Sequence, residues 1–432
     1  MNIWKTLMLI EFSVKNYRSL WEQQVLSMTA GGAIKDLQDR NTFDAPIKGP
    51  LKLLKSAVMY GPNGAGKSNL ISALDFMQQF VLGSSKNRQE GEPINRIPFR
   101  LHSQGPSETT ELEVFFIQDS VRYQYGFECN ETRVTHEWLL AYPENRAQRW
   151  FERAFNPETN EDEWYFGNKF SGTKKTWQGN TRPNALFLSA AVQLNSEQLK
   201  PVFSWFKNLV VIRHGEVLDP NFTIERCENE TSRQEILKFM KGADIDVDGI
   251  DIKVKKLSAN ELNIPDDLPM DLKKRIKADL DGQTVKQIKF NHHMIDSEDS
   301  TSFLLGDESD GTQKIFAYAG PWLDLLNSGR VLIIDELDNS FHPHIIRFLL
   351  NLIHNPESNK ANGQLIFSTH DTSVLDPKIF RRDQVWFVEK DKGNSTQIYS
   401  LSDFHPRKGE ALEKGYLKGR YGALPYIGEV NF

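Results

Sequence analysis

The stretch Gly61-Pro62-Asn63-Gly64-Ala65-Gly66-Lys67-Ser68 decides the fold of this chain. It matches the pattern G-x-x-x-x-G-K-[ST], in which a glycine-rich loop joins a buried strand to the start of a helix. Both flanks agree, because residues 56–60 suit a short buried strand and residues 69–74 carry apolar side chains at helical spacing. An accidental glycine-rich turn would not be expected to have both a buried strand before it and a helix after it. We therefore predict a phosphate-binding loop.

Each polar group of this loop has an expected role. The backbone N–H groups and the helix N-terminus would face the β-phosphate of ATP, and Lys67 would reach the β and γ oxygens. The Ser68 hydroxyl would help to hold Mg²⁺. The expected nucleotide-binding residues of this segment are Gly61, Pro62, Asn63, Gly64, Ala65, Gly66, Lys67, Ser68 and Asn69.

Composition sets broad limits on the protein. The chain has 432 residues, 39% of them hydrophobic and 25% charged, as in a globular protein with two or three packed units. Cys129 and Cys227 lie far apart without metal-ligand spacing, which favours a reducing, cytoplasmic compartment. No apolar run reaches about 18 residues, so we expect no membrane span. The net charge of −6 argues against a globally basic nucleic-acid binder, although contact through a local basic groove stays open.

The first part of the chain has the patterns of strands. Residues 12–20 alternate apolar and polar side chains like a half-buried strand, after a loose extension at residues 1–9. Residues 31–50 are polar and rich in turn formers, which predicts a surface loop. Three later segments have a period of two: 111–117, 121–128 and 135–141. They predict consecutive antiparallel strands.

Later segments predict a module and a parallel sheet. The chain is charged between residues 215 and 287, with a predicted helix at 232–241 and a predicted strand at 249–254. Beyond it, predicted helices and buried strands alternate: helix 311–326, strand 331–334, helix 343–354 and strand 364–370. Strands separated by helices at this spacing favour a parallel sheet and an α/β fold.

Two acids supply the second half of the expected site. Asp335 and Glu336 follow the strand at 331–334, where an ATPase needs one carboxylate for the Mg²⁺ shell and another for the attacking water. We assign Asp335 to Mg²⁺ and Glu336 as the general base. His370 ends the next strand, from which its ring would contact the γ-phosphate. The expected catalytic residues are therefore Lys67, Glu336 and His370.

The order of these motifs resembles the ABC-type ATPase head. It is most similar to the soluble branch that includes the RecF, SMC and OLD-like proteins. Under this resemblance, Ser309, Gly311 and Gln313 form the signature loop, although Asp310 stands where transporters usually carry glycine. The resemblance implies a head-to-tail homodimer or higher homo-oligomer, in which Ser309 and Gly311 act on ATP bound to Lys67 of a second subunit.

The same resemblance assigns three more residues to the nucleotide site. Asp338 is similar to the acid of the D-loop, and Arg18 to an arginine of the opening strand that lies near the nucleotide. Gln193 would supply the glutamine loop and a metal contact. The fold implied is an ABC-type P-loop ATPase head with an antiparallel β subdomain and an inserted α+β module. Its parts would be 8–150 (first part of the head), 151–287 (inserted module), 288–400 (second part of the head) and 401–432 (tail).

A narrower resemblance points to the prokaryotic RloA/AbiL-type ATPases. It is carried by residues 335–343, 368–371, 381–387 and 416–425. That family implies an ATP-hydrolysing sensor or regulatory subunit of an antiphage, abortive-infection system, beside a separate and often nuclease-like effector. The alternative is a RecF-like ATPase of DNA repair or chromosome maintenance, which would bind DNA without a partner.

We also hypothesise a contact surface near the C-terminus. Arg381, Arg382 and the tail at residues 415–425 would help to form a contact with a subunit or effector. The alternative is that these arginines lie in a solvated loop or pair with Asp383.

Overall fold

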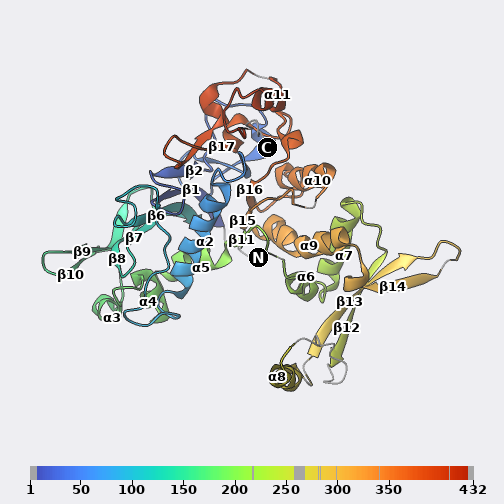
Figure 1. Ribbon diagram of the computed structural model, residues 1–432, viewed down its shortest axis with the longest axis horizontal. Helices are drawn as coiled ribbons and strands as arrows, with labels where there is room; N and C mark the ends of the chain where they lie inside the picture. The colour runs from blue at the N-terminus through green and yellow to red at the C-terminus, as the bar shows by residue number, and fades with distance from the viewer. Residues whose placement is uncertain are drawn as a thin grey trace, which may run out of the picture. The chain divides into compact units, whose positions relative to one another are not determined.

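The computed structural model describes residues 7–216, 218–256, 268–280, 282, 284–297, 299–339, 341–407 and 409–426. The chain divides into two compact units. Unit 1 consists of Met1–Glu216 and Asp324–Phe432, and unit 2 of Val217–Leu323. Figure 1 shows the elements of both. Among the described helices, none has the length and apolarity that crossing a membrane requires.

Unit 1 contains a large antiparallel sheet. Its strands are β1 (Leu7–Lys15), β2 (Gln24–Ser27), β6 (Thr110–Gln118), β7 (Val121–Cys129), β8 (Val134–Tyr142), β9 (Gln148–Asn156) and β10 (Glu161–Phe166). They lie in the order β10-β9-β8-β7-β6-β1-β2. The predicted run of antiparallel strands is confirmed, because β6, β7 and β8 pair consecutively with short turns between them.

The second sheet of unit 1 is the predicted parallel one. Its strands are β5 (Ser56–Tyr60), β11 (Val210–Ile212), β15 (Val331–Ile334), β16 (Gln364–Ser368), β17 (Val385–Lys390) and β18 (Thr396–Ser400). They lie in the order β11-β15-β16-β5-β17-β18, and only β18 is antiparallel to its neighbour. Every residue of β5, β15 and β16 is buried, as expected of parallel strands covered on both faces. The fold class is α/β, as predicted.

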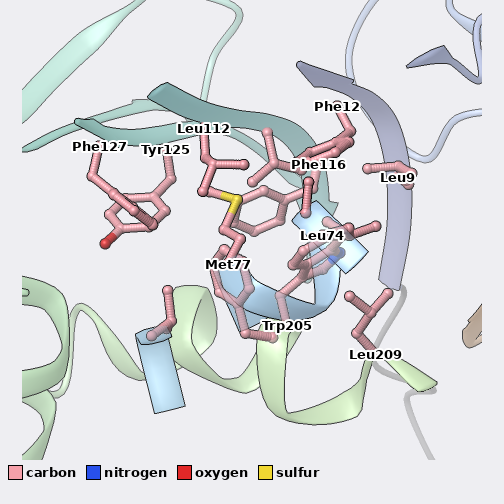
Figure 2. Close-up of a cluster of buried hydrophobic side chains, with 14 of the residues drawn as sticks. Leu9, Phe12, Leu74, Met77, Leu112, Phe116, Tyr125, Phe127, Trp205 and Leu209 are labelled. Atoms are coloured by element: carbon pink, nitrogen blue, oxygen red, sulfur yellow. The ribbon is translucent and has the colours of Figure 1, made fainter. Parts of the chain in front are cut away.

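Helices of unit 1 pack between and around these sheets. They are α1 (Gln38–Asn41), α2 (Lys67–Gly83), α3 (Lys174–Gly179), α4 (Phe187–Gln193), α5 (Lys200–Asn208), α10 (Pro343–His354) and α11 (Leu412–Leu417), and a small hairpin is formed by β3 (Thr42–Asp44) and β4 (Lys52–Leu54). Figure 2 shows Leu74 and Met77 of α2 beneath Leu112 and Phe116 of the antiparallel sheet. The Trp205 ring of α5 stacks on Phe116 with centroids 4.5 Å apart. One core therefore fixes α2, and with it the phosphate-binding loop.

Unit 2 is a smaller α+β body. Its elements are α6 (Asn221–Arg226), α7 (Glu230–Gly242), β12 (Gly249–Lys256), α8 (Met270–Leu280), β13 (Thr284–His293), β14 (Ser300–Leu304) and the first part of α9 (Asp310–Ser328), which continues into unit 1 at Asp324. The strands form an antiparallel sheet in the order β12-β13-β14. Phe290 of β13 meets Phe316 of α9 edge to face at 5.2 Å. The helix and strand predicted at 232–241 and 249–254 are both present, as α7 and β12.

Two predictions for the N-terminal region were wrong. The first strand begins at Leu7 and ends at Lys15, because Leu7 and Leu9 belong to the core rather than to a loose extension. Residues 1–6 of the predicted extension lie outside the described residues. The chain then turns through Asn16 and Arg18, which have positive φ angles. Residues 31–50 are not only a loop, since they contain α1 and β3.

The predicted inserted module, residues 151–287, does not coincide with unit 2. Strand β9 straddles residue 151 and pairs with β8, and β10 extends the same sheet. Helices α4 and α5 contribute buried side chains to the core that surrounds α2. Residues 151–216 therefore belong to unit 1, and the insertion starts at Val217.

The arginines near the C-terminus have intramolecular partners. Arg381 is 1% exposed, and its guanidinium binds both carboxylate oxygens of Asp383 at 2.7 and 2.9 Å. Arg382 donates to the Pro406 carbonyl at 2.8 Å. In the tail, the Tyr416 ring stacks on Phe387 of β17. A role for Arg381 in a subunit contact is thus overturned, and the pairing with Asp383 is the correct alternative.

A buried histidine makes unit 1 sensitive to acid. His354, at the end of α10, lies 2.8 Å from the Ser56 hydroxyl, and its burial, together with Arg40 and Lys55, lowers its pKa from 6.5 to about 3. Below about pH 6.5 this histidine therefore binds a proton in the unfolded chain but not in the folded chain, so stability is lost as the pH falls below that value. Between about pH 7.5 and 5.5 this histidine should remove about 1.4 kcal/mol from the free energy of unfolding.

The measurement is urea unfolding of the wild type and of His354→Gln at both pH values. Because the variant has no imidazole to protonate, its acid loss should be smaller than that of the wild type by about 1.4 kcal/mol. Equal losses in the two proteins would contradict the expectation.

Candidate nucleotide-binding site

The loop between β5 and α2 can be built only with glycine at two positions. A Cβ on Gly61 would lie 2.1 Å from the Val388 carbonyl oxygen of β17, and a Cβ on Gly66 would lie 2.1 Å from the Thr396 hydroxyl. Gly66 also has a φ of 114°, in the left-handed region that disfavours larger residues. These contacts press the loop against the neighbouring strands β17 and β18 and fix its shape.

Backbone donors of the loop are free. Within the described part of the chain, the N–H groups of Asn63, Gly64, Gly66, Lys67 and Ser68 donate to no protein acceptor. They border a cavity of about 670 Å³ that is lined by loop residues 62–69 together with His214, Glu336 and His370. The start of a helix attracts negative charge, and free N–H groups there form an anion site. The loop therefore fits a phosphate group.

Lys67 is held over this loop by backbone oxygens. The residue is 5% exposed, and its Nζ donates to the Gly61 carbonyl at 2.8 Å and to the Pro62 carbonyl at 3.3 Å. Burial lowers the pKa of Lys67, while the carboxylates of Glu336 and Asp335 act in the opposite direction. The ammonium thus lies at the phosphate loop, close enough to the acidic residues for their charges to favour its protonated form.

Asp335 and Glu336 are fixed by the adjacent strand. Asp335 follows β15 and is 6% exposed, and its Oδ1 accepts a hydrogen bond from the Ser368 hydroxyl at 2.6 Å. The backbone N–H of Glu336 donates to the same hydroxyl at 2.7 Å. Because β5, β16 and β15 are parallel neighbours, their carboxyl ends bring the loop and both acids to one edge of the sheet.

Two histidines flank the Glu336 carboxylate. His214 Nδ1 lies 2.7 Å from Oε2, and His370 Nε2 lies 3.7 Å from Oε1. Glu336 itself has a φ of 56°, which is strained for a residue with a side chain and turns it at the strand end. The predicted general base and the predicted γ-phosphate histidine are therefore brought together, within the cavity that the loop lines.

Asp338 has one carboxylate oxygen in use and one unsatisfied. Its Oδ2 accepts the backbone N–H of His370 at 3.0 Å, whereas its Oδ1 is buried without a hydrogen-bond partner in the described structure. A buried oxygen without a partner costs free energy unless something else binds it. Asp338 is therefore placed to accept a hydrogen bond from a further group when the site is complete.

The turn after β1 reaches the start of α2 through a chain of hydroxyl groups. Asn69 Nδ2 donates to the Ser19 hydroxyl at 2.6 Å, and that hydroxyl lies 2.7 Å from the Thr396 hydroxyl. Thr396 in turn donates to the Ala65 carbonyl at 2.7 Å. Arg18 and Asn69 both line a second cavity of about 610 Å³. Both residues predicted to bind nucleotide thus border one hollow beside the helix start.

The signature residues lie in unit 2. Ser309 precedes α9 and accepts the backbone N–H of Thr312 at 3.1 Å, which caps the helix. Gln313 Nε2 donates to the Glu308 carbonyl at 2.8 Å. Ser309 and Gly311 are exposed, and a Cβ on Gly311 would find only the Ser309 hydroxyl within 4 Å, at 3.8 Å. These residues form an open helix N-terminus in the unit that does not contain the phosphate loop.

Gln193 does not lie at the phosphate site. It is the last residue of α4, and its side chain accepts a hydrogen bond from Ser85, which lies beyond the C-terminal end of α2. The phosphate loop is at the other end of this 17-residue helix, about 25 Å away at 1.5 Å per residue. The structure therefore does not bring Gln193 to the site, and a metal contact from it is not supported.

His214 is the site residue that the sequence did not single out. It comes two residues after β11, which pairs in parallel with β15 so that Ile212 stands opposite Ile334. A polar residue directly after the apolar run at residues 209–212 was a signal, but only the order of the strands shows that this segment neighbours Asp335.

Mg²⁺ is compatible with these donors. Among the described residues, no group of three or more His, Cys, Asp or Glu side chains is placed to hold a metal ion by protein ligands alone. Mg²⁺ commonly takes one or two protein oxygens and completes its shell with phosphate oxygens and water. Ser68 and Asp335 are the residues that would hold it. Lys67 and the free N–H groups would then contact the nucleotide rather than the metal.

Comparison with known proteins agrees with this geometry. The family described as "AAA domain, putative AbiEii toxin, Type IV TA system" matches residues 56–376. The chain belongs to this AAA-domain family. Membership implies nucleotide binding, typically with Mg²⁺. No curated protein matches this AAA-domain chain.

Among solved structures, the AAA-domain protein is similar to the SMC head that was crystallised bound to the C-winged helix domain of ScpA. The sequences are 13% identical, and the match covers 91% of this chain and 97% of that chain with a TM-score of 0.39.

Proposed function

We propose that the protein hydrolyses ATP. The observation that carries this proposal is a single cavity in which free N–H groups of the phosphate loop, Lys67 and the Glu336 carboxylate meet. The loop and Lys67 would bind and orient the β- and γ-phosphates. Glu336 would take a proton from the attacking water, and His370 would contact the γ-phosphate. Bound Mg²⁺ would neutralise charge that develops on the phosphate oxygens.

The proposal includes a homodimer that clasps ATP between two subunits. Ser309 and Gly311 at the N-terminus of α9 are exposed, and the N-terminus of a helix attracts a negatively charged group such as a γ-phosphate. The phosphate loop has its own donors within unit 1, so the N-terminus of α9 is available to ATP on a second copy of the chain. The unsatisfied Oδ1 of Asp338 supports the same arrangement, because a partner subunit would supply its missing donor. A head-to-tail pair would thus complete two sites by symmetry.

The biological role that we propose is antiphage defence by abortive infection, in the manner of the RloA/AbiL-type systems. The support is the family itself, whose description refers to a toxin of a type IV toxin–antitoxin system. In this proposal the ATPase is the cytoplasmic sensor or regulator, and a separate, nuclease-like protein is the effector. ATP closes the dimer and hydrolysis opens it, so the nucleotide state would control the effector.

Lys67→Ala is the test of this proposal. The loss of the ammonium should reduce ATP hydrolysis at least about a hundredfold, because the charge that offsets the transferring phosphate is gone. In a host carrying the neighbouring genes, the same variant should lose protection in a phage plaque assay. Malachite-green phosphate release and plaque counts are the two measurements.

Gln193→Ala is the matched control, since this residue lies at the far end of α2. Its hydrolysis and its plaque counts should equal those of the wild type. Normal hydrolysis by Lys67→Ala would contradict the ATPase. Normal hydrolysis by the wild type without any effect on plaques would contradict the defence role alone.

A further inference from the structure

Of the two histidines beside Glu336, only His214 contacts its carboxylate directly. The 2.7 Å between His214 Nδ1 and Oε2 is a contact, whereas the 3.7 Å between His370 Nε2 and Oε1 exceeds hydrogen-bonding distance. The backbone of Glu336 is already fixed through Ser368. What His214 adds is a restraint on the flexible side chain, because it contacts one carboxylate oxygen of a residue that lines the cavity.

The turn that carries His214 is itself anchored to the helix behind the phosphate loop. Arg213 Nη1 lies 3.3 Å from an oxygen of Asp75 in α2. The turn closes through the Glu216 N–H, which donates to the Arg213 carbonyl at 3.1 Å, and Gly215 takes the positive φ of 74° that the turn needs. His214 therefore keeps a defined position relative to the loop that would bind the phosphates.

We propose that His214 is a positioning residue that orients the Glu336 carboxylate toward the attacking water. The inference rests on the proposed ATP hydrolysis and adds to it a residue outside the P-loop, the acidic strand end and the signature loop. The physical reason is that a general base acts only within hydrogen-bond reach of the proton that it removes. A glutamate side chain has several rotatable bonds, so it can sample directions in which its carboxylate does not reach the water, and the reaction is then slower. A misplacement of the carboxylate by about 1 Å can lower the rate about a hundredfold.

The test compares His214→Ala with His214→Asn in the full chain. Alanine removes the contact, and kcat should fall about 10- to 100-fold while KM changes less than about twofold, because the residue acts on the chemical step. Asparagine places an amide nitrogen near the position of Nδ1 and should recover most of the lost kcat. The His214 side chain is 54% exposed, so neither change removes a core contact. His344→Ala, at an exposed histidine outside the cavity, is the control and should match the wild type.

A double variant separates positioning from a structural effect. If His214 acts through Glu336, then His214→Ala combined with Glu336→Gln should hydrolyse ATP as slowly as Glu336→Gln alone. The dissociation constant for a fluorescent ATP analogue should stay within about twofold of the wild-type value in His214→Ala. A normal kcat in His214→Ala, no recovery in His214→Asn, or a further loss in the double variant would overturn the inference.

The same measurements distinguish this inference from the proposed function. If the wild type hydrolyses ATP, Lys67→Ala does not, and His214→Ala equals the wild type, the ATPase stands and the role of His214 fails. If the wild type hydrolyses no ATP, the proposed function fails and the role of His214 falls with it.

Discussion

Glu336→Gln should lower kcat for ATP hydrolysis by about 10²- to 10⁴-fold, because the amide cannot accept the proton of the attacking water. ATP binding should remain, since the loop donors and Lys67 are untouched. Glutamine preserves the size of the side chain, and the backbone N–H bond to Ser368 remains available. With hydrolysis blocked, the ATP-bound dimer should accumulate, and size-exclusion chromatography with light scattering in ATP and Mg²⁺ would detect it.

Two results would contradict this expectation. A variant that turned over ATP at the wild-type rate would remove Glu336 from the mechanism, and a variant that stayed monomeric with ATP bound would remove the proposed dimer. Glu163→Gln, on the exposed edge strand β10, is a suitable control because it makes the same chemical change away from the cavity. It should behave as the wild type in both measurements.

Ser309→Asp should abolish hydrolysis by a different route, with a loss of at least about 10²-fold. Aspartate caps a helix as well as serine does, so α9 should remain intact. The carboxylate would, however, repel the γ-phosphate that the partner subunit presents. Ser309→Thr keeps both the cap and the hydroxyl, and it should retain most of the activity. The rates of phosphate release of these two variants check the prediction directly.

Mixing variants tests whether the site is shared between subunits. Lys67→Ala and Ser309→Asp are each expected to be inactive as homodimers. A mixed dimer has one site with both defects and one site with neither, so an equimolar mixture should regain about a quarter of wild-type activity after subunit exchange. No recovery, together with normal mixing shown by differently tagged chains, would mean that Ser309 acts within its own subunit or not at all.

Local patterns were enough to predict most of the residues that the structure brings together in the candidate nucleotide site. The phosphate loop, Asp335, Glu336 and His370 each follow a buried strand, and parallel neighbours place strand ends at one edge of a sheet. For these residues, the chemistry and the position are both encoded in a few consecutive letters. The same holds for the antiparallel strands β6 to β8, whose alternation is local.

Other features depended on contacts between distant segments. His214 was missed because only the pairing of β11 with β15 brings it to Glu336. Gln193 was misplaced because α4 packs at the end of α2 opposite the loop, which no short motif states. For Arg381, the sequence left a contact surface, a solvated loop and a pair with Asp383 open, since nothing in it shows that the guanidinium also binds the distant Asp36 carbonyl. In each case the long-range packing, rather than the residue type, decided the outcome.

The continuity of α9 also limits how this gene can be dissected. One junction between the units is a tight turn at residue 216, but the other lies inside a helix, at residues 323 and 324. A truncated protein that joined residue 216 to residue 324 would keep only residues 324–328 of that helix, and so short a stub is too small to stay helical in isolation. The strand that follows it, β15, carries Asp335 and Glu336 at its end. Excising the smaller body would thus disturb the sheet edge on which the proposed hydrolysis depends, and an inactive deletion product would say little about what the excised part does.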